Sequence, residues 1–542
     1  MRLPPALAPL RHPLFRMLWT ANVVVSLGVW MQNTGAGWLM TTLSPDALTV
    51  SLVQAATILP IFLLALPAGA LADILDRRRF ILGTQGWMLA SAVLLTALTW
   101  FGLTGPTVLL ALTFAIGMGT AMNSPAWGSV MAEAVPRQDL VQAIALNGVG
   151  FNIARAVGPA IAGLILVFGG PTATFALNAV SYLAVVATLL AWRRRPRHSG
   201  LPPEHLLSAM RAGMRFVRHT PAVRAAMLRS ALYYGPAAAP WAMLPLVVRE
   251  ILHLDAGVYG MLLGLMGAGG VIAGLALPQI RRHLSQNATM LAATFCSAIG
   301  LALLGVAHHW LVAAVAMLIF GIGWVVAGSV AQGAAQLAAP SWVRSRALAI
   351  YQLASNGGLV IGTFVCGTLG NHIGLPATLL AASVVAVVCG VATHKFDLGE
   401  SEPAPRGAPP DVPLGDKVAP ELQPVLPSAR GRVLEIQRYR VAPAEREPFL
   451  AIMAELREVR GRAGALIWQI YEDVARADGW LEVWTVESWA DHLRESTRFS
   501  PADRAVLARA LAFHDGPPAP PACYLAIAPH AAIPRLPADP SG

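Results

Sequence analysis

Twelve apolar stretches of helix length fill this chain as far as residue 394, and short polar turns separate them. A helix needs about 20 apolar residues to cross the hydrocarbon core of a bilayer. The stretches of this kind are 15–42, 49–72, 80–102, 107–132, 140–168, 172–192, 224–248, 256–279, 287–307, 310–336, 345–370 and 375–394. The pattern predicts an all-α membrane protein whose twelve transmembrane helices form two six-helix halves, 1–192 and 222–395.

The two predicted halves repeat each other at a fixed offset of 204 residues. In this register Gly117, Gly119, Pro136, Ala143, Ala145, Asn152, Gly158 and Gly163 match Gly321, Gly323, Pro340, Ala347, Ala349, Asn356, Gly362 and Gly367. Duplicated halves are typical of secondary transporters, whose substrate site lies where the halves meet. Shared positions are expected to be scaffold. Asp73 pairs with Leu277, Arg155 with Leu359 and Pro159 with Thr363, and we expect these differences to set gating and substrate choice.

The arginines of the turns alternate between two sides of the predicted bundle. Turns rich in arginine, at 77–79, 137, 193–197, 281–282 and 344, alternate with turns that hold almost none. Because arginine-rich loops stay on the cytoplasmic side, we expect both termini in the cytoplasm of a multi-pass protein of the cell (inner or plasma) membrane. The net charge of +10 therefore belongs to membrane loops. It indicates the lipid bilayer, and no nucleic acid, as partner.

Three further segments lie outside the two halves. Residues 193–221 form a basic loop with an amphipathic segment, in which Arg211, Arg215 and Arg218 lie opposite an apolar face. We expect a helix on the inner membrane surface there, and a plain basic linker is the alternative. Residues 396–430 are a proline-rich linker. Residues 431–535 show the order β-α-β-β-α-β, which predicts a small α+β, ferredoxin-like cytoplasmic domain.

The turn after the second apolar stretch reads GALADILDRRRFIL, from residue 69 to residue 82. A glycine there lets two helices approach, and Asp73 can face the positive N-terminus of a helix. Arg77 can bind a carboxylate, for which Glu133 is our candidate. The turn resembles the loop signature of the major facilitator superfamily. The matching residues are Gly69, Leu71, Asp73, Arg77 and Arg78, with Asp76 where the family has glycine. We expect these contacts to hold the cytoplasmic side closed.

A second motif, NIARAVGPAIAG, runs from residue 152 to residue 163. Pro159 cannot donate a backbone hydrogen bond, so it loosens or bends the helix. Gly158 and Gly163 permit close helix contact. The motif resembles the Gly-Pro motif of the superfamily's antiporters and exporters. A packing kink with no bearing on transport direction is the alternative.

Two longer runs, NSPAWGSVMAEAVPRQDLVQAIALNGVGFNIARAVGP and VRSRALAIYQLASNGGLVIG, resemble the transmembrane secretion effectors, a subfamily that includes siderophore exporters. This resemblance implies efflux of a small hydrophobic or amphipathic molecule, such as a siderophore, drug or secondary metabolite, by alternating access and proton antiport. No Asp or Glu lies at the centre of a predicted span, so the sequence does not show a proton carrier. The segment 431–530 resembles the dimeric α/β-barrel extension of such proteins, which implies a homodimer through this domain.

Polar side chains inside the apolar stretches are candidates for a substrate cavity, because polar groups at this depth face the bundle interior. The candidates are Asn123, Asn147, Asn152, Arg155, Gln332, Gln336, Gln352 and Asn356. Each amide can instead bond a neighbouring helix. Arg155 is the one charged side chain near a predicted midplane, and a buried arginine stays protonated. We therefore expect Arg155 to face the cavity and to favour substrates with negative or acceptor groups.

The sequence indicates a transporter without a cofactor and not an enzyme. It has no GxxxxGK[ST] loop, so ATP is not the expected energy source. Its four cysteines show neither disulfide nor metal spacing, and we predict no metal. Two alternatives concern the C-terminal domain: a catalytic, monooxygenase-like domain, or a regulatory dimerisation module, which we favour. In the catalytic alternative the pocket is lined by Trp468, Trp480, Trp484, Trp489 and His492.

Overall fold

The computed structural model describes residues 5–191, 206–340, 343–399, 431–517 and 520–526. Most of the predicted linker 396–430 lies outside these described residues, as does 192–205 of the central loop. The chain divides into two units. One unit holds the membrane bundle. The other holds the soluble domain, helix α6 and the segment Ala335–Ile350.

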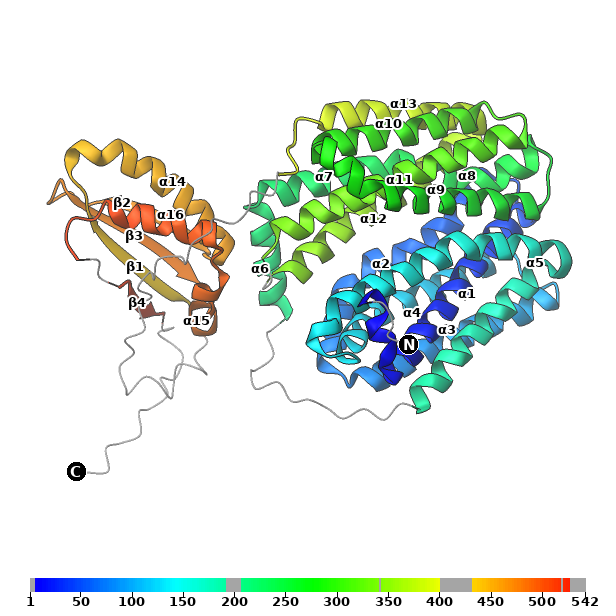
Figure 1. The fold of residues 1–542 in the computed structure, drawn as a ribbon, viewed down its shortest axis with the longest axis horizontal. Coiled ribbons are helices and arrows are strands. Elements are labelled where there is room, and N and C mark those ends of the chain that lie inside the picture. Colours follow the sequence, from blue (N-terminus) through cyan, green and yellow to red (C-terminus); the bar gives the residue numbers. More distant parts are fainter. Residues whose placement is uncertain (1–4, 192–205, 341–342, 400–430, 518–519, 527–542) are drawn as a thin grey trace. The chain divides into compact units, whose positions relative to one another are not determined.

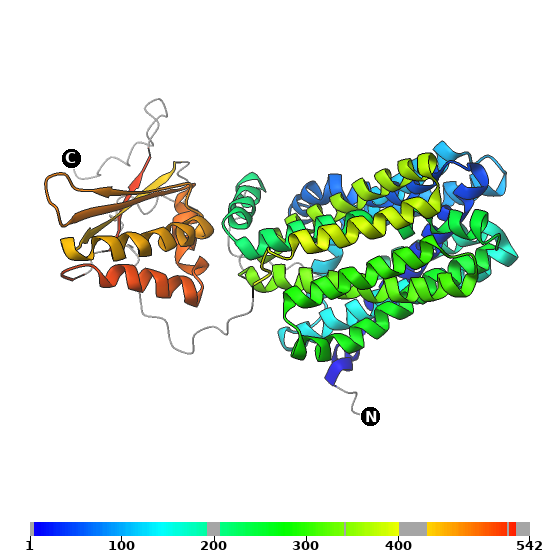
Figure 2. The same ribbon diagram turned by 90° about the horizontal axis from the view of Figure 1, so that it is seen from above.

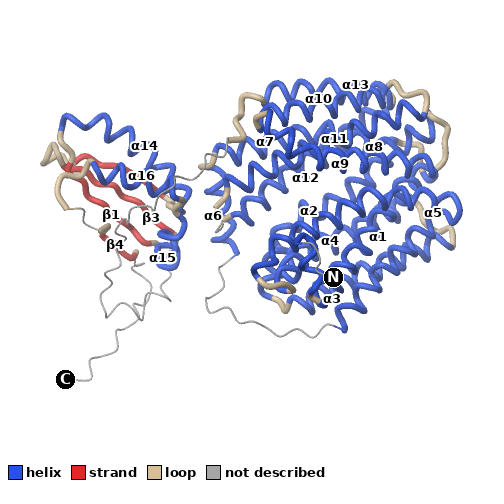
Figure 3. The backbone as a smooth tube through the Cα atoms, viewed as in Figure 1, coloured by secondary structure: helices blue, strands red, loops and turns tan. Residues whose placement is uncertain are grey.

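The membrane bundle is all helical in its described residues (Figures 1 and 3). The N-terminal half contains α1 (Pro13–Leu43), α2 (Ala47–Ile74), α3 (Arg77–Trp100), α4 (Pro106–Glu133) and α5 (Leu140–Ala191). The C-terminal half contains α7 (Pro221–Ala237), α8 (Ala239–Leu246), α9 (Ala256–His283), α10 (Gln286–Gly305), α11 (Trp310–Ala338), α12 (Arg344–Ile373) and α13 (Leu375–Thr393). Short helices of other types cover Pro5–Arg11, Arg137–Asp139 and Val247–Ile251.

Eleven helices of the described chain are long and apolar enough to cross a membrane. One of them, Gln142–Leu190, has 49 residues, more than twice the length that one crossing needs. Gly170 breaks it, with a φ of 65° that glycine adopts without strain. The helix α5 therefore supplies two crossings. Helices α7 and α8 follow one another as a single crossing, Pro221–Ile251. The described helices thus provide the twelve predicted crossings.

The predicted repeat is visible in the helices that its glycines touch. A Cβ atom added at Gly158 would meet Trp30 of α1, and one at Gly362 would meet Gly235 of α7. Helices α1 and α7 are the first crossings of the two halves. The three other matched pairs also touch equivalent helices, judged by what an added Cβ would meet. In the N-terminal half, Gly163 contacts α9, Gly117 contacts α2 and Gly119 contacts α3. In the C-terminal half, the matching Gly367 contacts α2, Gly321 contacts α9 and Gly323 contacts α10. The matched glycines are close-contact points at equivalent positions of the two halves.

The soluble domain has the predicted βαββαβ order with one additional helix. Its elements are β1 (Val433–Arg440), α14 (Arg446–Ala463), β2 (Ile467–Glu472), β3 (Gly479–Val486), α15 (Trp489–Arg498), α16 (Pro501–Ala512) and β4 (Ala522–Leu525). The sheet order is β2-β3-β1-β4, and every pairing is antiparallel. Helices α14 and α16 lie on one face of the sheet (Figure 2). This is the ferredoxin-like arrangement that the sequence predicts.

Buried and exposed residues alternate along the strands, so one sheet face forms the core. Strand β3 alternates between half-buried and buried positions over its whole length. The core includes Tyr439, Phe449, Leu456 and Trp480. Burial of such side chains contributes about 1.5–3 kcal/mol each.

The predicted amphipathic helix is present as α6 (Leu206–Arg218). Its arginines contact the soluble domain: Arg211 pairs with Glu487 at 3.1 Å, and Arg215 with the same carboxylate at 3.8 Å. Just after α6, His219 lies 3.0 Å from Glu458 of α14. The central-loop helix and the C-terminal domain therefore belong to one unit.

Candidate transport pathway

The two ends of the membrane bundle differ in charge. One end carries the turns around residues 77, 137, 281 and 344 and is called here the arginine-rich end. The other carries the turns 43–48, 103–106, 169–171, 249–255, 308–309 and 371–374 and is called the arginine-poor end. The contacts between the halves that are described below lie at the arginine-poor end and at mid-depth.

The predicted gating turn joins α2 to α3 at the arginine-rich end. Asp76 caps α3, since its carboxylate accepts a hydrogen bond from the backbone of Arg79 at 3.0 Å. Asp is a good N-cap residue, which explains the departure from glycine. Arg78 donates to the carbonyl groups of Leu189 at 2.9 Å and Leu190 at 3.0 Å, near the end of α5. Such carbonyl groups lack helical partners, so Arg78 acts as a cap.

Other members of the gating motif are only partly described. Leu71 packs against the buried cluster of the N-terminal half. The motif continues through the last turns of α2, with Gly69 and Asp73, to Arg77 at the start of α3, and its proposed partner Glu133 ends α4. The side-chain environment of these residues is outside the described part of the structure. The Arg77–Glu133 ion pair stays a prediction.

The Gly-Pro motif lies where the two halves cross. A Cβ at Gly163 would come within 2.9 Å of the Cα of Gly260 on α9, and one at Gly260 within 2.5 Å of the Pro159 carbonyl oxygen. Gly158 faces Trp30 of α1. The predicted bend at Pro159 does not appear as a break, because the residue of α5 with non-helical dihedral angles is Gly170. The motif acts as a contact surface between α5 and α9.

A latch of Asp46, Ala47 and Asn371 joins the halves at the arginine-poor end. The Asn371 amide donates to the Asp46 carboxylate, and its oxygen accepts from the Ala47 backbone at 2.8 Å. The same carboxylate caps α2 by accepting from the Thr49 backbone at 2.7 Å. The latch thereby links the start of α2 to the end of α12.

Two more contacts close the same end. Arg249 donates to the Thr41 hydroxyl at 3.2 Å. Trp38 of α1 and Tyr259 of α9 stack with ring centroids 5.9 Å apart. Each contact joins the N-terminal half to the C-terminal half. The bundle is therefore held together at its arginine-poor end.

At mid-depth, an aromatic cluster lies between the halves and consists of Trp30, Tyr234, Trp241 and Trp324. Ring centroids are 5.9 Å apart for Trp30 and Trp241, 5.6 Å for Trp241 and Trp324, and 4.8 Å for Tyr234 and Trp324. Edge and tilted contacts at these distances stabilise aromatic pairs by about 0.5–1.5 kcal/mol. Trp30 comes from the N-terminal half and the other three from the C-terminal half, so the cluster bridges the halves.

Arg155 lies beside this aromatic cluster. It lines a narrow cavity with Pro159, Trp241 and Trp324. A Cβ at Gly270 of α9 would lie 3.2 Å from its guanidinium. Within the described residues, its side chain forms no hydrogen bond or ion pair. A half-buried cation of this kind needs an acceptor group from a ligand or water.

A larger cavity of about 120 Å³ lies in the C-terminal half. Its lining is Tyr234, Trp324, Gln332, Tyr351, Gln352, Ser355, Asn356 and Leu359. The predicted residues Gln332, Gln352 and Asn356 thus lie together, on α11 and α12. Aromatic and amide groups in one cavity suit a ligand with both apolar and polar parts.

The other predicted cavity residues do not line this cavity. Asn147 accepts from Asn22 of α1 at 2.9 Å, and Asn123 accepts from Thr84 of α3 at 3.2 Å. Asn152 donates to the Gly148 carbonyl of its own helix at 2.9 Å. Gln336 is exposed near the end of α11. These amides bond neighbouring backbone or helices, which is the alternative that the sequence left open.

The comparisons with known proteins agree with this architecture. A family model described as transmembrane secretion effector matches residues 5–530. The chain belongs to this family, within the major facilitator superfamily. It is a multi-pass membrane transporter, and the match extends over the soluble domain as well.

Several curated relatives of this transporter are similar over most of their own length. The staphyloferrin A transporter of Staphylococcus aureus is 24% identical over 298 residues, 54% of this chain and 74% of the relative. The multidrug efflux pump Tap of Mycolicibacterium fortuitum is 26% identical over 399 residues, 70% of this chain and 95% of the relative. The enterobactin exporter EntS of Escherichia coli O9:H4 is 23% identical over 384 residues, 70% and 91% of the two chains.

Solved structures share the fold of the transporter. A bacterial homologue of the human lysosomal transporter Spinster, inward-facing and unoccupied, has a TM-score of 0.59 at 12% identity, covering 72% of this chain and 98% of its own. An inward-facing bacterial homologue of the iron transporter ferroportin has a TM-score of 0.55 at 16% identity, covering 71% and 99%. The helices of the membrane bundle therefore adopt the major facilitator fold.

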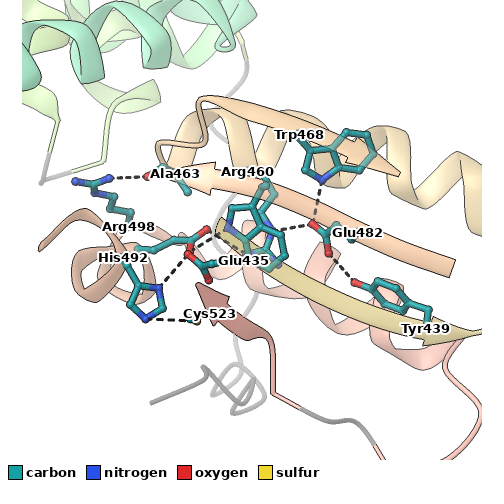
Figure 4. A network of polar contacts seen from close by, with 11 residues as sticks. Glu435, Tyr439, Arg460, Ala463, Trp468, Glu482, His492, Arg498 and Cys523 are labelled. Carbon is teal, nitrogen blue, oxygen red and sulfur yellow. Dashed lines mark hydrogen bonds and ion pairs between the residues drawn. The ribbon is translucent and has the colours of Figure 1, made fainter. Parts of the chain in front are cut away.

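The aromatic residues singled out in the soluble domain are mostly core. Trp480 and Trp484 are buried, and Trp468 donates from its indole nitrogen to Glu482 at 3.0 Å. Trp489 lies beside His492, with ring centroids 4.7 Å apart. Sequence reasoning missed the charged network around them, in which Arg460 bonds Glu482 at 2.9 Å (Figure 4). Arg460 also bonds Glu495 at 3.1 Å.

Proposed function

We propose that this transporter exports a small amphipathic molecule that carries a negative or hydrogen-bond-accepting group. The observation that carries the proposal is Arg155, a half-buried cation without a described partner, beside the aromatic cluster. Apolar and amide groups of the larger cavity would contact the rest of the ligand. Relatives named as siderophore and multidrug exporters support this class of cargo.

We also propose that the arginine-rich end faces the cytoplasm, with both termini on that side. The positive-inside rule supports this orientation. The latch of Asp46, Ala47 and Asn371 closes the opposite end, and Gln332 and Gln352 lie on the arginine-rich side of the aromatic cluster. A cargo loaded from the cytoplasm would reach this cavity first. Rocking of the two halves would then break the latch and release the cargo outside.

Substitution of Arg155 tests the proposed cargo class. Cells that express Arg155→Gln or Arg155→Lys are loaded with a panel of anionic, neutral and cationic amphipathic compounds, and retention is measured. We expect Gln to lose export of the anionic compounds while Lys keeps part of it, because Lys retains the charge but not the planar fork. The control is Arg282→Ala, which removes an exposed arginine of α9. Equal export by Arg155→Gln and the parent across the panel would refute the proposal.

Proton antiport is the energy source that we propose, following the family resemblance. Export into inside-out vesicles with an imposed pH gradient measures it directly. The rate should rise with an acidic interior and fall when an uncoupler is added. A rate that ignores both treatments would rule out proton coupling.

For the soluble domain we propose homodimerisation through the sheet face that α14 and α16 leave uncovered. This face exposes Ile467, Tyr471 and Tyr524 by 51%, 48% and 53%. An apolar sheet face of this kind is typical of a protein contact. Mass measurement of the full-length protein in nanodiscs should give two chains, and Ile467→Asp should give one. A parent protein that is monomeric at micromolar concentration would exclude this role.

A further inference from the structure

Three reactive side chains from three separate elements of the soluble domain lie together. Glu435 is on β1, His492 on α15 and Cys523 on β4. Glu435 and Cys523 face each other directly in the antiparallel register of β1 and β4. One candidate ligand atom from each of the three residues lies within 4.8 Å of the other two.

Each nitrogen of the His492 ring has its own partner in this cluster. Nδ1 lies 2.9 Å from a carboxylate oxygen of Glu435, and Nε2 lies 4.0 Å from the sulfur of Cys523 (Figure 4). The carboxylate therefore fixes the ring so that Nε2 points at the sulfur. A carboxylate, an imidazole and a thiol in this order form the arrangement in which a base, oriented by a third group, activates a nucleophile.

Charged groups behind the cluster hold Glu435 in place. Its carboxyl group shares a hydrogen bond with Glu495. Glu495 in turn accepts from Arg460 at 3.1 Å and from the Trp484 indole nitrogen at 3.4 Å. Burial raises the pKa of Glu495 to about 7, against the opposing effect of Arg460. Glu495 thus holds a proton at neutral pH more readily than an exposed glutamate does.

The electrostatic environment favours a positive His492. Burial alone would lower the pKa of this imidazole, but the contacts with Cys523 and Glu435 outweigh burial and raise it to about 10. An imidazolium ion beside a cysteine lowers the cost of forming the thiolate. The thiolate, and not the thiol, is the nucleophilic form of cysteine.

Cys523 is more exposed than the two residues that support it. Glu435 and His492 are only 2% and 7% exposed, whereas Cys523 is half-buried on a short strand of the sheet. The three other cysteines, Cys296, Cys366 and Cys389, lie in α10, α12 and α13 of the membrane bundle. Cys523 is therefore the cysteine of the described chain that small aqueous reagents can reach beside a histidine.

We propose that Cys523 is a reactive thiol, activated by His492 and Glu435, that forms mixed disulfides with low-molecular-weight disulfides. The Cys523 thiolate attacks one sulfur of the small disulfide. The new sulfur–sulfur bond forms as the old one breaks, so Cys523 is oxidised and the leaving half is reduced to a thiolate. The leaving thiolate takes the proton of the imidazolium. A thiol of the small molecule reverses the step, which makes the site a reversible modification site.

The geometry favours this role over a metal site. One candidate ligand atom from each of the three residues lies within 4.8 Å of the others, but the Glu435 carboxylate is already engaged by Nδ1 of His492. Zinc in proteins takes three or four protein ligands, so a metal here would need all three residues, Glu435 included. Metal binding is accordingly the competing outcome of the test.

The test is the pH dependence of alkylation of the full-length protein in detergent. Iodoacetamide is added between pH 6 and pH 8, and peptide mass spectrometry follows each cysteine separately. For Cys523 we expect a rate that changes less than about threefold over this range, because the imidazole beside the sulfur is proposed to activate it. A thiol with the usual pKa of about 8.5 reacts about tenfold faster per pH unit. Such a steep rise for Cys523 in the parent protein would overturn the proposal.

Variants and a second reagent separate the roles of the three residues. His492→Asn should slow alkylation at pH 7 at least about tenfold and restore the steep pH dependence. The alkylation rate of Cys523 in Glu435→Gln should lie between the rates in His492→Asn and in the parent protein. The matched control Glu472→Gln, on β2 of the same sheet, should show the parent rate. Oxidised glutathione should add to the Cys523 peptide, and dithiothreitol should remove it. The competing outcome is a metal site. The parent protein would then bind one equivalent of zinc that protects Cys523 from alkylation, and both His492→Asn and Glu435→Gln would lose this zinc. That result would refute the thiol role.

Discussion

Removal of the Asn371 side chain is the sharpest test of how the bundle is held closed. Asn371→Ala deletes both hydrogen bonds that α12 makes to the start of α2, one to the Asp46 carboxylate and one from the Ala47 backbone. Asp46 is the poorer target, because its carboxylate also caps α2 through Thr49. Substituting Asn371 leaves that cap intact, so the effect reports the latch alone.

The expected size follows from the two bonds. A hydrogen bond to a charged group contributes about 1.5–3 kcal/mol and a neutral one about 0.5–1.5 kcal/mol. Asn371 is exposed, so water replaces part of what is lost, and we take the lower limits, about 2 kcal/mol in total. That free energy shifts the equilibrium toward opening at the arginine-poor end by about 30-fold.

The shift is measured with a cysteine reporter at the closed interface. Thr41 is 5% exposed and bonds Arg249 of the other half, so Thr41→Cys is labelled only when the halves separate at this end. The reporter is placed in a chain without its four native cysteines, and the rate of maleimide labelling is followed in nanodiscs. Asn371→Ala should raise this rate by one to two orders of magnitude.

The neighbouring residue supplies the matched control. The His372 ring bonds a carbonyl of its own helix, that of Thr368, at 2.8 Å and takes no part in the latch. His372→Ala should leave the labelling rate of Thr41→Cys unchanged. An unchanged rate in Asn371→Ala, or an equal rise in both variants, would show that the latch does not hold the bundle closed.

Three further predictions concern close contacts and buried charges. Gly260→Ala should reduce transport several-fold, because the new Cβ would lie 2.5 Å from α5 and such overpacking costs about 1–3 kcal/mol. The control is Gly274→Ala on the same helix, whose Cβ would meet nothing within 4 Å and which should leave transport unchanged in the same assay. Arg460→Ala should lower the free energy of unfolding of the soluble domain by about 3–5 kcal/mol, as measured by hydrogen exchange, because it leaves buried carboxylates unpaired. The control Arg509→Ala removes an exposed ion pair and should lower it by less than about 1 kcal/mol. The pKa of His492 is raised from 6.5 to about 10, so the contacts of its charged ring stabilise the domain fully below pH 6.5, and this stabilisation is lost as the pH rises toward 10. Protection of the β1 amides from hydrogen exchange should therefore fall between pH 6.5 and pH 10 in the parent protein but not in His492→Asn.

The sequence predicted the helices well, because hydrophobic length is a strong signal for a membrane crossing. The two crossings of α5 were predicted separately, and the structure joins them into one helical element broken at Gly170. Short strand-like runs in a βαββαβ order likewise predicted the strands of the soluble domain. The predicted βαββαβ order counts one helical segment between β3 and β4, and the structure divides this segment into α15 and α16, where Ser500 and Asp503 form a capping box.

The candidate site was predicted less completely, for a physical reason. An amide inside a crossing can face a cavity or bond a neighbouring helix, and the sequence does not distinguish the two. Gln332 and Gln352 face the cavity, whereas Asn147 bonds Asn22, which is 125 residues away. The aromatic cluster carries no separate signal, since tryptophans are common in apolar stretches. His492 and Glu435 are 57 residues apart, so only the folded sheet brings them together.

The repeat of the two halves places two chemically different residues at matching positions beside the aromatic cluster. Arg155 and Leu359 occupy matching positions of α5 and α12. Both line cavities that contain Trp324, Arg155 together with Trp241 and Leu359 together with Gln352. Equivalent positions therefore place a cation from one half and an apolar side chain from the other in two cavities that share Trp324. A ligand that contacts both needs an acceptor group at one end and an apolar body at the other, so this charged difference between the halves suits the amphipathic cargo that we propose.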